Sequence, residues 1–176
     1  MDPKRTIEAF DVFLARRGLS LDAVIVGGTA LGLLGVITRD CDVLQPRLPE
    51  PVIQAARDFA AEARRSGEML GDEWLNDGPS SLADDLPRGW QDRVQIAYEG
   101  EAVTLHTLGR LDLLRSKMFA LCDRAIDLPD CIALRPTEDE LVRVLPWLEA
   151  RDANPDWPAH VRATVIDLRR RLGHAV

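Results

Sequence analysis

Cysteine, histidine and aromatic residues are scarce in this sequence. Its 176 residues include three cysteines and three histidines, and aromatic side chains make up 5% of the chain. Cys41, Cys122 and Cys131 form no Cys-x-x-Cys pair, so we expect no zinc site and interpret them as small buried residues. No apolar run approaches the length of a membrane-spanning helix and no apolar leader follows Met1, so we expect a cytoplasmic protein with no membrane partner.

Two common nucleotide-binding fingerprints are also missing. The chain contains neither the Gly-x-Gly-x-x-Gly of dinucleotide-binding folds nor a Gly-Lys-Ser/Thr sequence, which excludes a Rossmann fingerprint and a P-loop. The net charge of −7 argues against general binding to nucleic acids, although it leaves room for a local basic groove. The hydrophobic share of 46% predicts a globular protein with a proper core.

The most informative stretch contains two aspartates, Asp40 and Asp42, on a predicted strand. Side chains alternate along a strand, so both carboxylates are expected on the same side of the sheet. Carboxylates that close repel each other unless a cation lies between them. A hard divalent cation such as Mg²⁺ (or Mn²⁺) binds oxygen ligands of this kind together with substrate phosphates. Taken alone, such a pair is more often two solvated loop residues.

A glycine turn precedes these aspartates by about a dozen residues. The apolar run at 24–26 ends in Gly27-Gly28, and Thr29 begins a predicted helical turn. Glycines let backbone N–H groups approach a phosphate, and a helix start favours an anion. Taken alone, this is a tight turn between a strand and a helix. Beside the aspartates it predicts a phosphate cradle next to a metal site, as phosphoryl transfer requires.

This combination resembles the signature of the DNA polymerase β-like nucleotidyltransferase superfamily, which pairs a Gly-Gly/Ser turn with an Asp-x-Asp on the next strand. The sequence is similar to its small bacterial branch related to abortive-infection toxins of the AbiEii type. The resemblance implies a mixed α/β (α+β) fold with a small mixed sheet flanked by helices. We expect one domain over residues 1–176, with a sheet-containing core at 1–109 and a helical part at 110–176.

A predicted helix at 111–125 carries a line of cations. Arg110, Lys117 and Arg124 are spaced by seven and follow the edge of its apolar face. Long cationic side chains at such an edge can reach into a neighbouring cleft, although a solvated basic face is the commoner interpretation.

Residues 117–130 resemble the Lys-…-Arg-…-Asp-x-x-Asp segment of the abortive-infection branch. The resemblance implies that Lys117 and Asp127 are catalytic, with Lys117 holding phosphate oxygens and Asp127 completing the acidic site. It leaves Arg124 either to hold the site together or to contact phosphate of the nucleotide, and it leaves the role of Asp130 open. The line of cations adds Arg110 as a further nucleotide-binding candidate.

Two regions between these motifs bear on the mechanism. Residues 71–92 show no regular periodicity, and the resemblance implies a place near the mouth of the site. Trp74 and Trp90 in this segment fit base stacking, although core packing is the commoner role. A hairpin is predicted around residues 99–101, where many members of the superfamily carry a third metal-binding carboxylate, but the strand offers only His106.

The resemblance, together with these patterns, implies a Mg²⁺-dependent enzyme that transfers a nucleotidyl group from a nucleoside triphosphate such as ATP. The acceptor, a tRNA or other RNA, a protein or a small molecule, is left open, and the resemblance adds a toxin–antitoxin or defence role. The missing third carboxylate motivates an alternative, a catalytically silent scaffold that binds nucleotides or a protein partner. A phosphohydrolase with Asp40 as nucleophile is a weaker alternative, because the residues around Asp40 lack the expected pattern.

Overall fold

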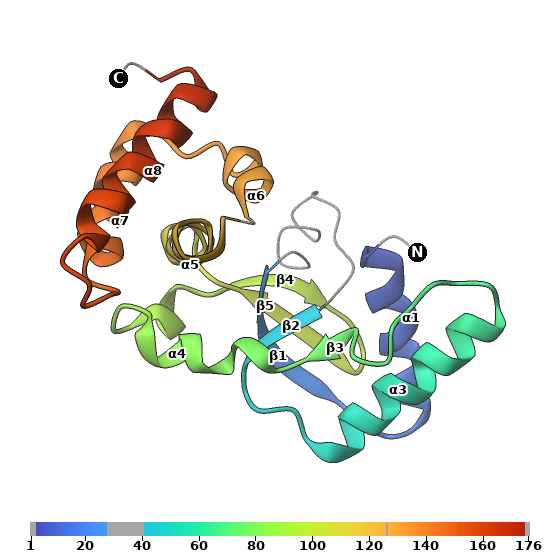
Figure 1. Cartoon of the computed structure of the whole chain (residues 1–176). Coiled ribbons are helices and arrows are strands. Elements are labelled where there is room, and N and C mark those ends of the chain that lie inside the picture. Colours follow the sequence, from blue (N-terminus) through green and yellow to red (C-terminus); the bar gives the residue numbers. More distant parts are fainter. Residues whose placement is uncertain (1–2, 28–40, 126, 175–176) are drawn as a thin grey trace. The chain divides into compact units, whose positions relative to one another are not determined.

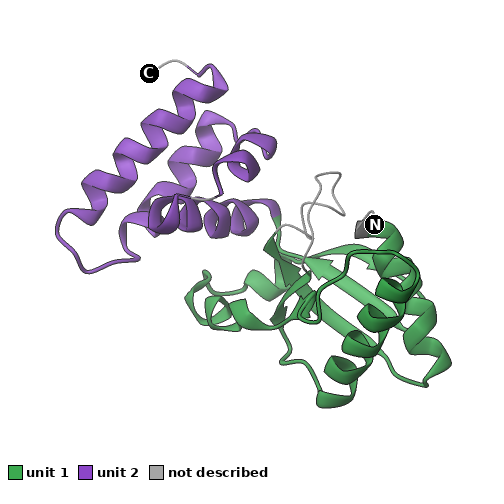
Figure 2. Ribbon diagram, turned by 45° about the vertical axis from the view of Figure 1, so that its right-hand side comes forward, with its two compact units in different colours: residues 1–109 green, residues 110–176 purple. Residues whose placement is uncertain are grey.

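One five-stranded mixed sheet organises the N-terminal half of the chain. The computed structural model describes residues 3–27, 41–125 and 127–174 (Figure 1). The chain divides into two compact units, residues 1–109 and 110–176, shown in Figure 2. The predicted mixed α/β fold with a helical C-terminal half is confirmed.

The sheet has the strand order β3-β2-β1-β5-β4. β1 lies at its centre, antiparallel to β2 and parallel to β5, while β3 is parallel to β2 and β4 is antiparallel to β5. The predicted first strand and the predicted hairpin are both confirmed. The strands are β1 (Leu21–Val26), β2 (Cys41–Gln45), β3 (Leu75–Asn76), β4 (Gln95–Glu99) and β5 (Val103–Thr107).

Two helices, α1 (Pro3–Arg16) and α3 (Glu50–Arg65), pack against each other beside the sheet. Their contact is aromatic: the ring centroids of Phe10 and Phe59 are 5.3 Å apart, and Trp74 lies 5.0 Å from Phe10. The indole N–H of Trp74 donates to a backbone carbonyl of α3 at 3.0 Å, so the ring is buried without an unpaired donor. This cluster joins α1, α3 and the segment that leads into β3.

The two faces of the sheet differ in polarity. Along β1, Leu21, Ala23 and Ile25 are buried, whereas Asp22 is exposed and Val24 is half-buried. Alternation of this kind is expected when one face is packed and the other is more open. The polar face is the one that carries the candidate site residues of this unit.

The segment at 71–92 is more ordered than its sequence predicts. After β3 it forms two 3₁₀ turns, at Gly78–Ser81 and Trp90–Arg93, and a short helix α4 (Leu82–Asp85). Elements of two to four residues are too short to show periodicity, which explains why the sequence appears patternless. Trp74 and Trp90 are each 2% exposed, so both are core residues. The core alternative considered for them is confirmed.

A buried carboxylate ties α1 to the β4–β5 turn. Asp11 accepts backbone N–H bonds from Glu101 at 3.1 Å and from Ala102 and Val103 at 2.7 Å each. The α-carbon of Gly100 lies so close to this carboxylate that a Cβ would overlap it. Burial raises the pKa of Asp11, but the backbone N–H bonds outweigh it and leave the pKa below its ordinary value.

The C-terminal unit is built from helices around an apolar core that includes Leu114, Met118 and Trp157. One of these helices begins with a capping box: Thr137 accepts from the N–H of Glu140, whose carboxylate accepts from the N–H of Thr137. No helix in the described ranges is long and apolar enough to span a membrane. The helices are α5 (Arg110–Arg124), α6 (Leu128–Ala133), α7 (Glu138–Glu149) and α8 (Trp157–Leu172).

Candidate functional site

The end of β1 and the start of β2 meet at a glycine. Val26 pairs with Asp42 across the two antiparallel strands, and Gly27 follows with φ +71°. A Cβ placed on Gly27 would overlap the carboxylate of Asp42. Glycine is therefore required here twice, by the left-handed backbone and by the space that the carboxylate occupies. The result is a carboxylate held directly against the backbone at the turn.

The Asp42 carboxylate has a second neighbour on the other side. It is half-buried, and its Oδ1 accepts a hydrogen bond from the amide of Asn76 at 2.9 Å. Asn76 lies on β3 in register with Asp42. Sequence reasoning missed this residue. The available signal was the Asn-Asp-Gly-Pro turn at 76–79 directly after a tryptophan and a leucine.

The remaining predicted residues of this motif are Gly28, Thr29 and Asp40, and they lie outside the described residues. Their roles as phosphate cradle and as second metal ligand stay predictions. Within the ranges that the structure describes, no group of three or more His, Cys, Asp or Glu side chains is arranged to hold a metal ion.

On β5, the polar face of the sheet carries a histidine. His106 pairs with Val24, two residues before Val26 along β1, so it shares the face of Asp42. Its Nε2 lies 3.0 Å from Oδ1 of Asp22, and its side chain is 23% exposed. Glu99, the last residue of β4, pairs with the far end of β5. Neither strand therefore places a carboxylate level with Asp42.

In the C-terminal unit, Lys117 forms an ion cluster with two aspartates. Lys117 is 5% exposed, and its Nζ lies 2.5 Å from Asp130 and 3.6 Å from Asp127. Asp127 is the N-cap residue of α6 and Asp130 lies in its first turn. A buried ammonium needs such partners, because an unpaired charge is costly to remove from water. The structure therefore brings together three residues of the segment that carried the resemblance.

The other two cations of the predicted line differ from Lys117. Arg110 donates to both carboxylate oxygens of Glu140, at 2.5 and 3.0 Å, and this pair raises the pKa of Arg110. The Arg124 side chain is 61% exposed, with Nε 3.9 Å from Asp123. Arg110 thus joins α5 to α7, whereas Arg124 presents its charge at the surface.

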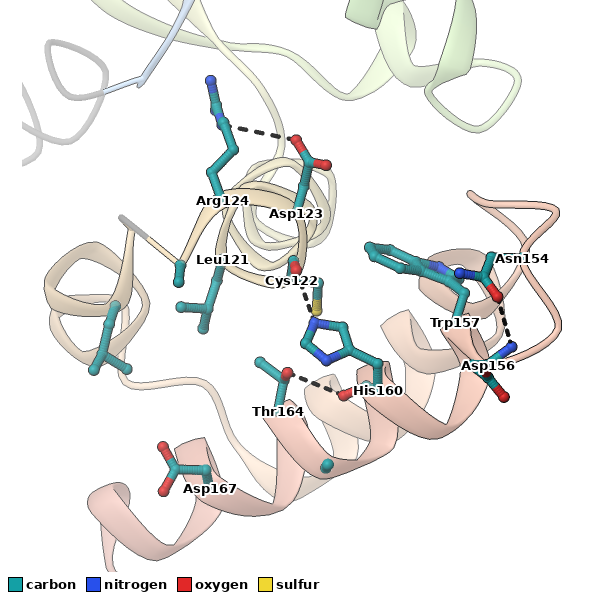
Figure 3. A pocket seen from close by; sticks show the side chains of 13 residues that line it. Leu121, Cys122, Asp123, Arg124, Asn154, Asp156, Trp157, His160, Thr164 and Asp167 are labelled. Atoms are coloured by element: carbon teal, nitrogen blue, oxygen red, sulfur yellow. Dashed lines mark hydrogen bonds and ion pairs between the residues drawn. The ribbon is translucent and has the colours of Figure 1, made fainter.

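A pocket of about 850 Å³ lies in the C-terminal unit, between the end of α5 and α8. In it, His160 donates from Nε2 to the carbonyl of Cys122 at 2.8 Å, which satisfies a carbonyl near the end of α5. Figure 3 shows the Arg124 side chain extending away from His160. None of the Lys117 cluster lines this pocket. Among the described residues to which the motifs assign chemistry, Arg124 alone lines this pocket.

The polar turn of the sheet and the lysine–aspartate cluster both fall within a stretch that matches a known family. Residues 5–133 match a nucleotidyltransferase family. The chain belongs to that family, which is described as "Nucleotidyltransferase of unknown function (DUF6036)". The match supports the predicted superfamily and does not extend to the abortive-infection branch. No curated protein and no solved structure matched the chain.

Proposed function

We propose that the protein transfers a nucleotidyl group from a nucleoside triphosphate to an acceptor, with Mg²⁺ or Mn²⁺ as cofactor. The observation that carries this proposal is the Asp42 carboxylate held against Gly27 at the end of β1, within the range that matches the family. The left-handed glycine leaves room for this carboxylate where any other residue would place a side chain, so the carboxylate lies directly against the backbone of the turn.

The oxygen ligands of this turn fit a hard divalent cation. Asp42 has one oxygen bonded to Asn76 and the other against Gly27, and Asp40, two residues earlier, is the predicted second carboxylate. Asp40 and Asp42 would hold the metal, and no sulfur or imidazole ligand is required. A bound cation supplies neutralisation of the negative charge on the phosphate oxygens.

The proposed reaction joins the acceptor to the α-phosphate. The acceptor oxygen forms a bond to the α-phosphorus, the bond from that phosphorus to the bridging oxygen breaks, and pyrophosphate leaves. The acceptor hydroxyl gives up its proton to solvent water as the new bond forms. We assign Gly27, Gly28 and Thr29 to binding the triphosphate through their backbone N–H groups.

Residues of the C-terminal unit have their own roles in this proposal. Lys117 holds phosphate oxygens, and its contacts with Asp127 and Asp130 fix the place of its ammonium. Arg124, with an exposed side chain, contacts phosphate as well. The guanidinium of Arg110 is paired with the carboxylate of Glu140. Arg110 can therefore bind the nucleotide directly only when that ion pair opens.

Thermal unfolding with ATP, GTP, CTP and UTP, each with and without Mg²⁺, tests the proposal. A ligand at about 100 times its Kd stabilises a protein by about 2.7 kcal/mol, or about 5–10 °C at this size. We expect a Mg²⁺-dependent rise that Asp42→Asn abolishes. Incubation of an α-labelled triphosphate with tRNA, protein and small-molecule pools then identifies the acceptor by its label.

A silent scaffold is the second candidate function. It is favoured by His106 on β5, because many members of the superfamily carry a third metal-binding carboxylate in this region. In that case the fold binds a nucleotide or a protein partner, as a member of a toxin–antitoxin pair would. Triphosphate binding that persists in Asp42→Asn, with no label transferred by the wild type, supports this candidate over the enzyme.

A further inference from the structure

Asn76 contacts the Asp42 carboxylate in a single defined orientation. Its Nδ2 donates to Oδ1 of Asp42 at 2.9 Å, and its own Oδ1 accepts from the backbone N–H of Gly78 at 3.0 Å. A backbone N–H can only donate, so the amide oxygen must face Gly78 and the amide N–H₂ must face Asp42. The turn at Gly78 therefore determines which end of the amide the carboxylate meets.

The backbone that carries Asn76 is anchored to the core. β3 pairs with β2 over only two residues, but the carbonyl of Trp74 accepts from the N–H of Cys41 at 2.5 Å. The indole of Trp74 is itself bonded to Ala56 of α3. On the other side, a Cβ at Gly78 would lie only 3.1 Å from the amide oxygen, so the turn closes tightly around Asn76. A short edge strand is thus held on both sides of the amide.

We propose that Asn76 is a positioning residue that orients Asp42 for binding a divalent cation, an inference that rests on the proposed function. The amide holds one carboxylate oxygen, and the other lies against Gly27, so rotation of the carboxylate is restricted at both oxygens. The amide is neutral and donates to the carboxylate, so it stabilises the charge on Asp42 without adding a competing one. Partners of this kind fix the geometry of metal-binding carboxylates.

Two substitutions separate this role from the role of Asn76 in its turn. Asn76→Ala removes the bonds to Asp42 and from Gly78, together with a longer bond of 3.5 Å from Nδ2 to the carbonyl of Glu73. Asn76→Ser keeps a hydroxyl that can accept from Gly78, but it is too short to reach Asp42. Asp77→Ala is the matched control, because Asp77 lies in the same turn and its substitution removes a different side-chain bond, the one it accepts from the N–H of Leu48 at 3.1 Å.

The measurement is thermal unfolding of the full chain while Mn²⁺ is titrated at a fixed concentration of whichever of ATP, GTP, CTP and UTP most stabilises the wild type. We expect the half-saturating Mn²⁺ concentration to rise about 10- to 100-fold in Asn76→Ala and in Asn76→Ser. Excess Mn²⁺ should restore the full stabilisation, because Asp42 itself is retained. Asp77→Ala should titrate as the wild type does.

The possible results separate this inference from the proposed function. A wild type that gains no Mn²⁺-dependent stabilisation overturns both. A wild type that does, with both Asn76 variants titrating at the same Mn²⁺ concentration, overturns the positioning role alone. A loss that excess Mn²⁺ does not restore shows a purely structural residue and also overturns it. If Asn76→Ala does not fold, Asn76→Ser decides.

Discussion

The carboxylate of Asp42 lies against the α-carbon of Gly27, where β1 ends in left-handed backbone. Gly27 and Asp42 are 15 positions apart in the chain, yet they are in direct contact. Of the pair Gly27-Gly28, the described residues include Gly27. The contact makes the identity of residue 27 depend on residue 42, and this dependence can be measured.

Gly27→Ala should cost more than the backbone conformation alone. A left-handed residue other than glycine costs about 1–2 kcal/mol, and the added methyl group must also displace the Asp42 carboxylate. Gly18→Ala is the matched control, since Gly18 has φ +63° and nothing within 4 Å of its added Cβ. Urea unfolding of both variants, with triphosphate binding measured alongside, isolates the contact. Equal losses in the two variants contradict it.

Removal of the Lys117 ammonium should leave two aspartates facing each other without a cation. Since the lysine is buried and the carboxylates are about one-fifth exposed, we expect Lys117→Met to lower the free energy of unfolding by about 2 kcal/mol. Adding Asp130→Asn should recover part of that loss. Arg124→Met, at an exposed cation, should change stability by about 0.5 kcal/mol or less.

The same variants separate stability from activity. If Lys117 holds phosphate, the Lys117→Met/Asp130→Asn protein regains stability but not nucleotidyl transfer. Recovery of both together contradicts a role for Lys117 in the reaction.

Asp11→Asn should destabilise the protein at neutral pH and less so in acid. The folded-state pKa of Asp11 lies below its unfolded value of about 3.9, so its contribution is fully present above that value and is lost as the pH falls through the folded pKa. We expect a loss of about 2 kcal/mol at pH 7, because the amide cannot accept all three N–H bonds. Urea unfolding at pH 7 and pH 3 measures the difference, which should be smaller at pH 3.

Asp58→Asn is the control for that experiment. Its pKa is also lowered, by a hydrogen bond from Arg17, but Asp58 lies at the surface. Solvent screens such pairs, so its variant should show a much smaller change at both pH values. An equal pH dependence in both variants contradicts the assignment to Asp11.

The three cysteines should resist alkylation in the folded protein. All are buried, and burial raises the pKa of Cys122 to about 11 and that of Cys131 to about 12. The pKa of Cys41 is also raised, by burial and by the negative charge of the neighbouring Asp42. Because the thiolate is the reactive form, iodoacetamide at pH 7.5 should label the native protein far more slowly than the protein in urea. Rapid native labelling of any one of them contradicts this prediction.

Local patterns in the sequence were sufficient to predict most of the elements. The apolar run at 24–26 predicted the strand that became β1, and the turn at 99–101 predicted the hairpin of β4 and β5, because both signals depend on neighbours in the chain. The six residues of α6 and the two of β3 were missed, since neither is long enough to show a period. The Gly-Gly and Asp-x-Asp motifs were sufficient to predict a nucleotidyltransferase, which the family match supports.

Contacts between distant residues were decided by tertiary structure. The spacing of seven predicted the same position around the helix for Arg110, Lys117 and Arg124. Periodicity defines that angle, but it does not show which residues pack against each side chain. Packing then buried Lys117 between two aspartates, paired Arg110 with Glu140 and left Arg124 exposed. Asn76 stands 34 residues from Asp42 and meets it through strand register, which no local pattern encodes. The sequence by itself therefore determined most of the elements and the superfamily, while register and helix packing decided which polar groups are in contact.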